Sequence, residues 1–174
     1  NADLRALAFN SVRNELYVVN GALGAAKLHT VDTLTNTLKS GSIAIGAAPR
    51  NVIVSPDGAT IYVCSDYSGQ NRVTVIDAAT SASVATITLN NIDPYGMAIA
   101  RNKLYVVGTT DGWVYVIDLD SASPNYRRVI KSINAGVGAY DAVARPDGAY
   151  VYVSLDKTDG AVAVIDTATD QLVG

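Results

Sequence analysis

The chain has 174 residues, of which 49% are hydrophobic and 17% charged, and its formal net charge is −3. This length can bury the core of one domain, and the acidic balance argues against the basic surface with which proteins usually bind nucleic acid. The single cysteine, Cys64, excludes an internal disulfide and a multi-cysteine metal cluster. No apolar run approaches the roughly 18–20 residues that span a bilayer, so we expect no membrane span.

Short segments rich in Val, Ile, Thr and Tyr follow one another along the chain and predict β-strands. The first group covers Leu4–Phe9, Glu15–Val19, Lys27–Val31 and Leu38–Ile45. The second covers Asn51–Ser55, Thr60–Cys64, Arg72–Asp77 and Val84–Leu89. The third covers Gly96–Ala100, Lys103–Val107, Trp113–Ile117 and Arg128–Ile133. The fourth covers Asp141–Arg145, Tyr150–Ser154, Ala161–Ile165 and the incomplete Gln171–Gly174.

Two kinds of turn separate these strands. Pro56-Asp57-Gly58 joins the first two strands of the second group, because Pro presets φ and Gly tolerates a positive φ. Asp77-Ala78-Ala79-Thr80 joins its last two strands, and the Asp77 side chain can accept backbone N–H groups of that turn. The corresponding reversal of the third group, Leu119–Tyr126, is several residues longer. We therefore interpret the recurring Asp as a structural residue.

The four groups are repeats of one unit. Equivalent tyrosines are 45, 43 and 47 residues apart, at Tyr17, Tyr62, Tyr105 and Tyr152. Equivalent aspartates are 45, 41 and 48 residues apart, at Asp32, Asp77, Asp118 and Asp166. A repeat of roughly 40–50 residues made of four strands predicts an all-β propeller of antiparallel meander blades. We expect one propeller domain or propeller fragment over residues 1–174, with blades near 1–46, 47–91, 92–136 and 137–174.

Three motifs resemble those of YVTN-type β-propellers. They are Tyr17-Val18-Val19-Asn20, Ser55-Pro56-Asp57-Gly58 and Val164-Ile165-Asp166-Thr167-Ala168-Thr169. The resemblance covers essentially the whole chain and implies an extracellular, periplasmic or surface-layer protein, often with seven blades and generally without an assigned reaction. Some related propellers are lactonase-like or belong to quinone-dependent dehydrogenase complexes. The resemblance implies no particular cofactor for this chain, and we predict none.

Four repeats with an unfinished last strand fit part of a larger ring. An open arc leaves apolar blade faces exposed, so we expect completion by further blades or by a second copy, which gives eight blades. A self-closed ring of four blades is the alternative. The chain begins at Asn1 without an initiator Met or a signal peptide, which fits a processed or cloned fragment.

Strand order places the loops between repeats, and those between second and third strands, at one end of each blade. Binding residues concentrate on such variable loops over a rigid scaffold. Aligning the first strands places polar or aromatic residues at this end, and they form our candidate ligand site: Arg5, Arg50, Asn51, Tyr95, Tyr140 and Asp141. The alternative is that these residues only solvate a channel mouth and bond to neighbouring blades.

Other candidates for chemistry are weaker. Asp66, Tyr67, Asp111, Asp156 and Asp159 offer oxygen ligands, but their spacing matches no calcium loop and we predict no metal site. His29, the one histidine, lies within a strand without a nominated nucleophile, so we predict no catalytic residue. Cys64 fits a small buried hydrophobe better than a reactive thiol.

The densest basic cluster is Tyr126-Arg127-Arg128 with Lys131. Strand alternation is expected to send Arg127 and Arg128 to opposite faces, which splits the patch. We interpret these charges as protection of an outer strand edge and expect no nucleic-acid partner.

The leading hypothesis is a non-enzymatic binding or surface-interaction module of an exported or cell-envelope protein, with a protein or an envelope polymer as ligand. One alternative is a lactonase or quinone-dependent enzyme that uses Arg50, Tyr95, Tyr140 and Asp141 at the channel mouth. A further alternative is an architectural fragment that assembles with another copy.

Overall fold

The computed structural model describes residues 3–21, 26–67, 69–156 and 160–174. Over these residues the secondary structure consists of strands without a helix, as the sequence predicts. Consequently no helix of the described part is long and apolar enough to cross a membrane. The chain divides into two compact units, Asn1–Thr88 and Leu89–Gly174, which are called unit 1 and unit 2 below.

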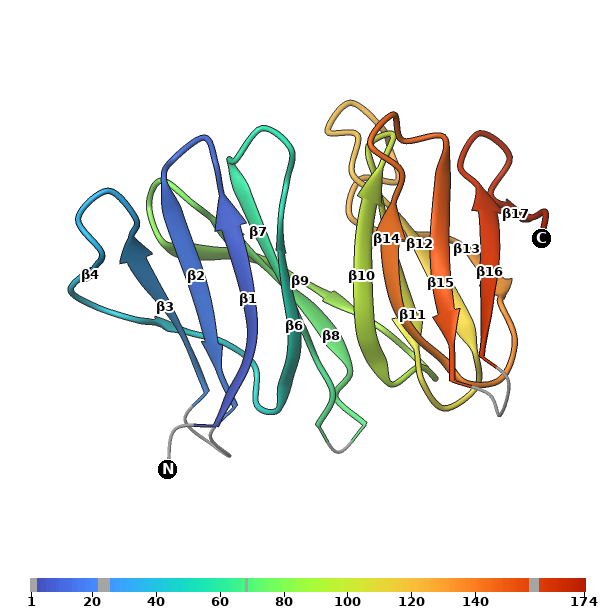
Figure 1. Cartoon of the computed structure of the whole chain (residues 1–174), viewed down its shortest axis with the longest axis horizontal. Helices are drawn as coiled ribbons and strands as arrows, with labels where there is room; N and C mark the ends of the chain where they lie inside the picture. The colour runs from blue at the N-terminus through green and yellow to red at the C-terminus, as the bar shows by residue number, and fades with distance from the viewer. Residues whose placement is uncertain (1–2, 22–25, 68, 157–159) are drawn as a thin grey trace. The chain divides into compact units, whose positions relative to one another are not determined.

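Each unit contains two antiparallel sheets built from strands that are consecutive in the chain (Figure 1). The first sheet of unit 1 contains β1 (Leu4–Asn10), β2 (Glu15–Asn20), β3 (Lys27–Asp32), β4 (Thr37–Leu38) and β5 (Ile43–Ala44). The second contains β6 (Pro49–Val54), β7 (Thr60–Ser65), β8 (Arg72–Asp77) and β9 (Ala82–Thr88). These two sheets are blades 1 and 2.

Unit 2 repeats this arrangement. Blade 3 contains β10 (Pro94–Ala100), β11 (Lys103–Gly108), β12 (Trp113–Asp118) and β13 (Val129–Asn134). Blade 4 contains β14 (Ala139–Ala144), β15 (Tyr150–Leu155), β16 (Ala161–Asp166) and β17 (Gln171–Leu172). The predicted four-stranded meanders are therefore confirmed, including the short last strand.

The outer strand of blade 1 differs from the prediction. We expected one strand over Leu38–Ile45, and the structure has two short ones, β4 and β5, which both pair with β3. Leu38 lies opposite Val31 and Ile43 opposite Leu28, so five steps along the outer strand face three along β3. The two additional residues cannot join the ladder, and they interrupt the strand.

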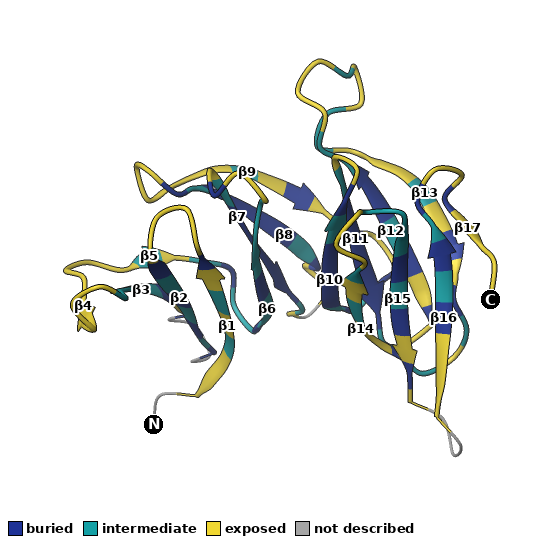
Figure 2. Cartoon of the chain, turned by 45° about the horizontal axis from the view of Figure 1, so that its top comes forward, coloured by how far each residue is buried: buried dark blue, intermediate teal, exposed yellow. Residues whose placement is uncertain are grey.

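Blade packing within each unit explains the burial pattern (Figure 2). In unit 1, Tyr17, Val19 and Leu28 of blade 1 form one cluster with the residues of blade 2 that face them, Val52, Ile61, Val63, Ile76 and Ala78. In unit 2, Tyr105 and Val107 of blade 3 belong to the corresponding cluster with Val151 and Val153 of blade 4. The repeat Tyr of the first blade in each unit, Tyr17 or Tyr105, thus lies in the core between the two blades of that unit, whereas Tyr152 of blade 4 is half-buried.

The recurring aspartates organise tight turns, as predicted. Asp77 Oδ1 accepts hydrogen bonds from the backbone N–H groups of Ala79 at 3.0 Å and Thr80 at 2.7 Å. Asp166 does the same with Ala168 at 2.8 Å and Thr169 at 3.0 Å. These bonds stabilise the ionised form and lower the pKa of both carboxyl groups.

Candidate functional site

The first strand of every blade carries a β-bulge near its beginning. Each contains one more residue than its partner strand between matched pairs: Leu4/Ala6, Pro49/Asn51, Pro94/Met97 and Ala139/Ala142. Bulges re-aim side chains and are common beside functional sites. The predicted site residues lie at these bulges: Arg5, Arg50, Asn51, Tyr95, Tyr140 and Asp141.

Unit 2 brings three of these residues together. The rings of Tyr95 and Tyr140 lie 4.3 Å apart between centroids and are inclined by 36°. Tyr140 is 45% exposed, so the pair offers an aromatic surface to solvent. A Cβ on Gly96 would lie 2.5 Å from Asp141 Cα, so the backbones of blades 3 and 4 approach closely beside the rings. The exposed Asp141 carboxylate accepts a hydrogen bond from Ala142 N at 2.9 Å.

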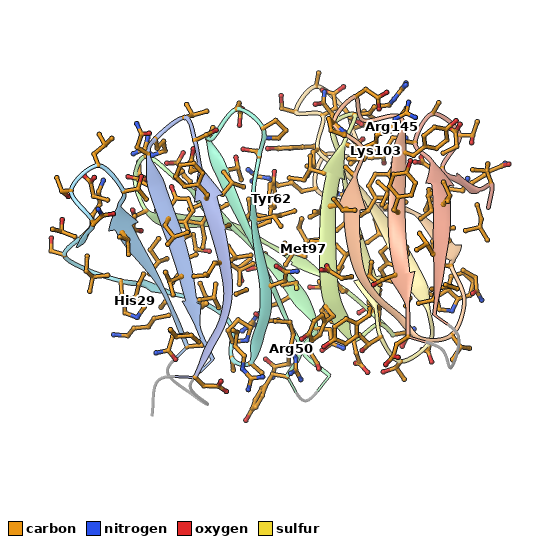
Figure 3. All side chains as sticks on the ribbon, in the orientation of Figure 1. His29, Arg50, Tyr62, Met97, Lys103 and Arg145 are labelled. Carbon is orange, nitrogen blue, oxygen red and sulfur yellow. The ribbon has the colours of Figure 1, made fainter. Side chains whose placement is uncertain are left out.

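In unit 1 the equivalent positions hold ion pairs. Arg50 Nη2 donates to Asp66 Oδ2 at 3.0 Å, and both side chains are about one-third exposed. Asp66 N also donates to Ala48 O at 3.1 Å, so the β7–β8 loop lies beside the start of β6, as strand order predicts. Figure 3 shows Arg50 at this end of the blade. The pair leaves no net charge.

The other two predicted residues of unit 1 make local contacts. Arg5 Nη2 lies 2.5 Å from Asp3 Oδ2, and both groups are exposed. Asn51 Oδ1 accepts from Val52 N at 2.7 Å. A shared surface of all six residues stays a prediction, as does their role in binding.

The weaker candidates have ordinary surroundings. Among the described residues, no three His, Cys, Asp or Glu side chains are grouped to hold a metal, and Asp159 lies outside them. Cys64 is fully buried, as predicted. His29 is half-buried on β3 opposite Val18.

The explanation given for the basic cluster is wrong. Arg127 and Arg128 precede β13 and lie in a turn, so strand alternation does not separate them. Arg127 Cζ instead lies 4.6 Å from the centre of the Tyr126 ring, and Lys131 Nζ donates to Thr169 O at 3.0 Å.

Two buried carboxylates at the opposite end of the blades escaped the sequence analysis. Glu15 is buried and accepts from Lys39 Nζ at 2.6 Å, Tyr17 Oη at 2.6 Å and Arg13 Nε at 2.9 Å. Burial alone would raise the pKa of Glu15, but the hydrogen bonds from Lys39, Tyr17 and Arg13 outweigh it and lower the pKa to about 2. Burial and the bond to Glu15 raise the pKa of Tyr17 to about 12.

Asp170 has the corresponding role in unit 2. It accepts from Tyr105 Oη at 2.6 Å and from Lys103 Nζ at 2.6 Å, which joins blade 3 to the last turn of blade 4. Burial, together with the bond to Asp170, raises the pKa of Tyr105. The signal available in the sequence was that Glu15 is the only Glu of the chain and stands two residues before a repeat Tyr.

Comparisons with known proteins support the propeller fold. The chain is 29% identical over 132 residues to the seven-bladed β-propeller protein Rv1057 of Mycobacterium tuberculosis. That alignment covers 74% of this chain and 32% of the relative, so the chain spans about a third of that protein's length. No protein-family model matches the chain.

Two solved structures have a similar fold. A chain of Kuenenia stuttgartiensis hydrazine synthase matches with a TM-score of 0.82 and 24% identity, covering 97% of this chain and 47% of that one. A chain of the mitotic checkpoint complex matches with a TM-score of 0.78 and 16% identity, covering 100% of this chain and 50% of that one. The chain therefore has a β-propeller fold and spans about half of each of these larger chains.

Proposed function

We propose that this chain is a non-enzymatic interaction module of an exported or cell-envelope protein, built from β-propeller blades of the YVTN type. The observation that carries the proposal is the Tyr95–Tyr140 pair at the bulged ends of β10 and β14, with centroids 4.3 Å apart. The resemblance of the chain's repeat motifs to YVTN-type propellers, which are typically extracellular, periplasmic or surface-layer proteins, supports an exported location.

The residue types at the bulged ends favour a macromolecular ligand. Tyr and Arg dominate the residues that contribute most to protein–protein binding, because they combine apolar area with hydrogen-bonding groups. The pair presents Tyr140 at 45% exposure beside the exposed Asp141 carboxylate. A protein segment or an envelope polymer can pack on the rings and donate hydrogen bonds to Asp141.

Exposed apolar side chains on blade 1 support completion by further blades. Leu7 and Phe9 of β1 are 62% and 57% exposed, and Leu38 of β4 is 64% exposed. The equivalent face of blade 2 packs on blade 1, and its Val52 and Ile61 are each 1% exposed. We therefore propose that another blade of the same type covers this face, supplied by a longer chain or by a second copy.

The binding proposal is tested with a panel of envelope polymers and envelope proteins, each immobilised and titrated with purified chain. We expect one ligand to bind the wild type and to lose at least about ten-fold in affinity with Tyr140→Ala. Val84→Ala, which truncates a 49% exposed side chain on β9, is the matched control and retains wild-type affinity. Equal binding by both variants, or turnover of a lactone by the purified chain, would contradict the proposal.

A further inference from the structure

Unit 1 contains a polar pocket that the proposed function does not use. Its volume is about 300 Å³, at the lower end of the range for small-ligand sites. It lies between the outer strand of blade 1 and the β8–β9 turn of blade 2. Leu28, Ile43 and Ala78 supply the apolar part of its lining. The polar part of the lining comes from Arg13, Glu15, Thr30, Lys39, Ser40, Ser42 and Ser81.

The interrupted outer strand forms one wall of this pocket. Residues 39–42 connect β4 to β5 and line the cavity together with β3. Gly41 has a φ of +88°, and a Cβ there would meet no atom within 4 Å. Three residues of the segment that interrupts the strand, Ser40, Gly41 and Ser42, therefore line the pocket.

The charges in the pocket do not balance. Arg13 and Lys39 both pair with one carboxylate, that of Glu15, whose side chain is 5% exposed. The pocket lining therefore holds two cations and one carboxylate, and Asp77, on which Arg13 also acts, lies just outside the lining. The Arg13 and Lys39 side chains are 34% and 44% exposed, so each has further N–H groups that a ligand can reach.

In unit 2 the second blade supplies a carboxylate at the corresponding location, where Arg101 and Lys103 are the nearby cations. Lys103 stands two residues before Tyr105, as Glu15 stands before Tyr17. Asp170 stands four residues after the turn aspartate Asp166, as Ser81 stands after Asp77. There Lys103 Nζ donates to Asp170 Oδ2 at 2.6 Å across the two blades. In unit 1 the equivalent residue is Ser81, and Glu15 is the carboxylate that accepts from the repeat Tyr and from both cations.

We propose that the unit 1 pocket binds a small organic carboxylate, whose carboxyl group is held between Ser81 and the exposed N–H groups of Arg13 and Lys39. Arg13 and Lys39 bind the carboxylate oxygens, and charge-assisted hydrogen bonds of this kind are the strong ones. Ser81 and Ser42 donate hydrogen bonds from their hydroxyl groups. Leu28, Ile43 and Ala78 contact the body of the ligand, which the volume limits to a short aliphatic acid or a single sugar acid.

The test uses the whole ¹⁵N-labelled chain titrated with sodium propionate, sodium glucuronate, glucose and sodium sulfate. We expect at least one carboxylate to bind with a Kd in the millimolar range or below and to shift the amide signals of Ser40–Ser42 and Ala78–Ser81. Glucose and sulfate are expected to bind at least about ten-fold more weakly. The proposal would be overturned if neither carboxylate shifts these signals. It would also be overturned if sulfate or glucose binds as tightly as the carboxylates.

Ser81→Asp is the decisive variant, because it introduces the unit 2 carboxylate into the unit 1 pocket. Ser81 and Asp170 have nearly the same backbone, with φ of +58° and +53°, so the substitution fits the turn. We expect it to weaken carboxylate binding at least about ten-fold. Ser121→Asp adds the same charge at an exposed position of unit 2 and is expected to bind within about two-fold of wild type. The proposal would be contradicted if Ser81→Asp bound the carboxylate with wild-type affinity. It would also be contradicted if Ser121→Asp lost as much affinity as Ser81→Asp.

Discussion

Glu15 provides the sharpest stability prediction, and Glu15→Gln is the perturbation. The folded protein holds the pKa of Glu15 at about 2, compared with an ordinary value of 4.5. Each pKa unit corresponds to about 1.4 kcal/mol, so the ionised form contributes up to about 3 kcal/mol more than the protonated form. The side chain is 5% exposed, so solvent screens little of this contribution.

The pH dependence follows from the direction of the shift. Because the pKa of Glu15 is lower in the folded state, its contribution is complete above about pH 4.5 and is lost as the pH falls towards 2. Gln keeps the size of the side chain but resembles the protonated acid. We therefore expect Glu15→Gln to be less stable than wild type by up to about 3 kcal/mol at pH 7, and the difference to vanish near pH 2.

Urea unfolding followed by far-UV circular dichroism at several pH values measures this difference. The comparison of variant with wild type isolates Glu15, because other carboxyl groups such as Asp147, whose pKa Arg145 lowers to about 2, titrate in both proteins. A difference that stays constant between pH 7 and pH 2.5 would refute the reasoning, since it would have an origin other than ionisation.

Three further predictions concern packing and assembly. Asp170→Ala leaves the buried Tyr105 hydroxyl and Lys103 without their carboxylate, and we expect urea unfolding to show a loss of about 2–4 kcal/mol in unfolding free energy. In a Tyr105→Phe background the same substitution is expected to cost about 1 kcal/mol less, because the Tyr105 hydroxyl is already absent. Strictly additive effects of the two substitutions would contradict the bond between Tyr105 and Asp170. Gly96→Val places a Cβ 2.5 Å from Asp141 Cα and is expected to lower the unfolding free energy by about 1–3 kcal/mol or more, whereas unchanged stability would show that blades 3 and 4 are farther apart. Leu7→Glu replaces a 62% exposed Leu with a charged side chain on the face of blade 1 that we propose another blade covers. If a second copy supplies that blade, light scattering is expected to show a smaller mass for the variant than for wild type, at an equal unfolding temperature. An assembly of wild-type mass in the variant would place the interface elsewhere.

The repeat architecture was predictable because every blade is encoded by a similar local pattern of strands and turns. A Tyr and an Asp recur at similar spacing, and the Asp turns form by short-range hydrogen bonds that the sequence contains completely. Cys64 is buried as predicted, but alternation is not the reason, because β7 is buried on both faces from Ile61 to Ser65.

What the sequence did not predict depends on register and on contacts between blades. A bulge such as that at Arg50 can be recognised only once the residue pairing of two strands is known. The same holds for the gap between β4 and β5, which arises because the outer strand has two more residues than the stretch of β3 that it pairs with. The pairing of Asp170 with Tyr105 joins residues 65 positions apart. The predicted strand began at Arg128, and the observed strand begins one residue later, at Val129, so both Arg127 and Arg128 lie before the strand and alternation does not apply to them.

The central claim, that the Tyr95–Tyr140 end of unit 2 contacts a partner, is tested most directly by site-specific photo-crosslinking. A benzophenone amino acid replaces Tyr140 in the chain expressed in its own organism, and a matched protein carries it at Val84, on the exposed outer strand β9. We predict a discrete crosslinked product from position 140 that is absent with Val84 and is lost when Tyr95→Ala is added. No product from position 140, or the same product from both positions, would contradict the claim.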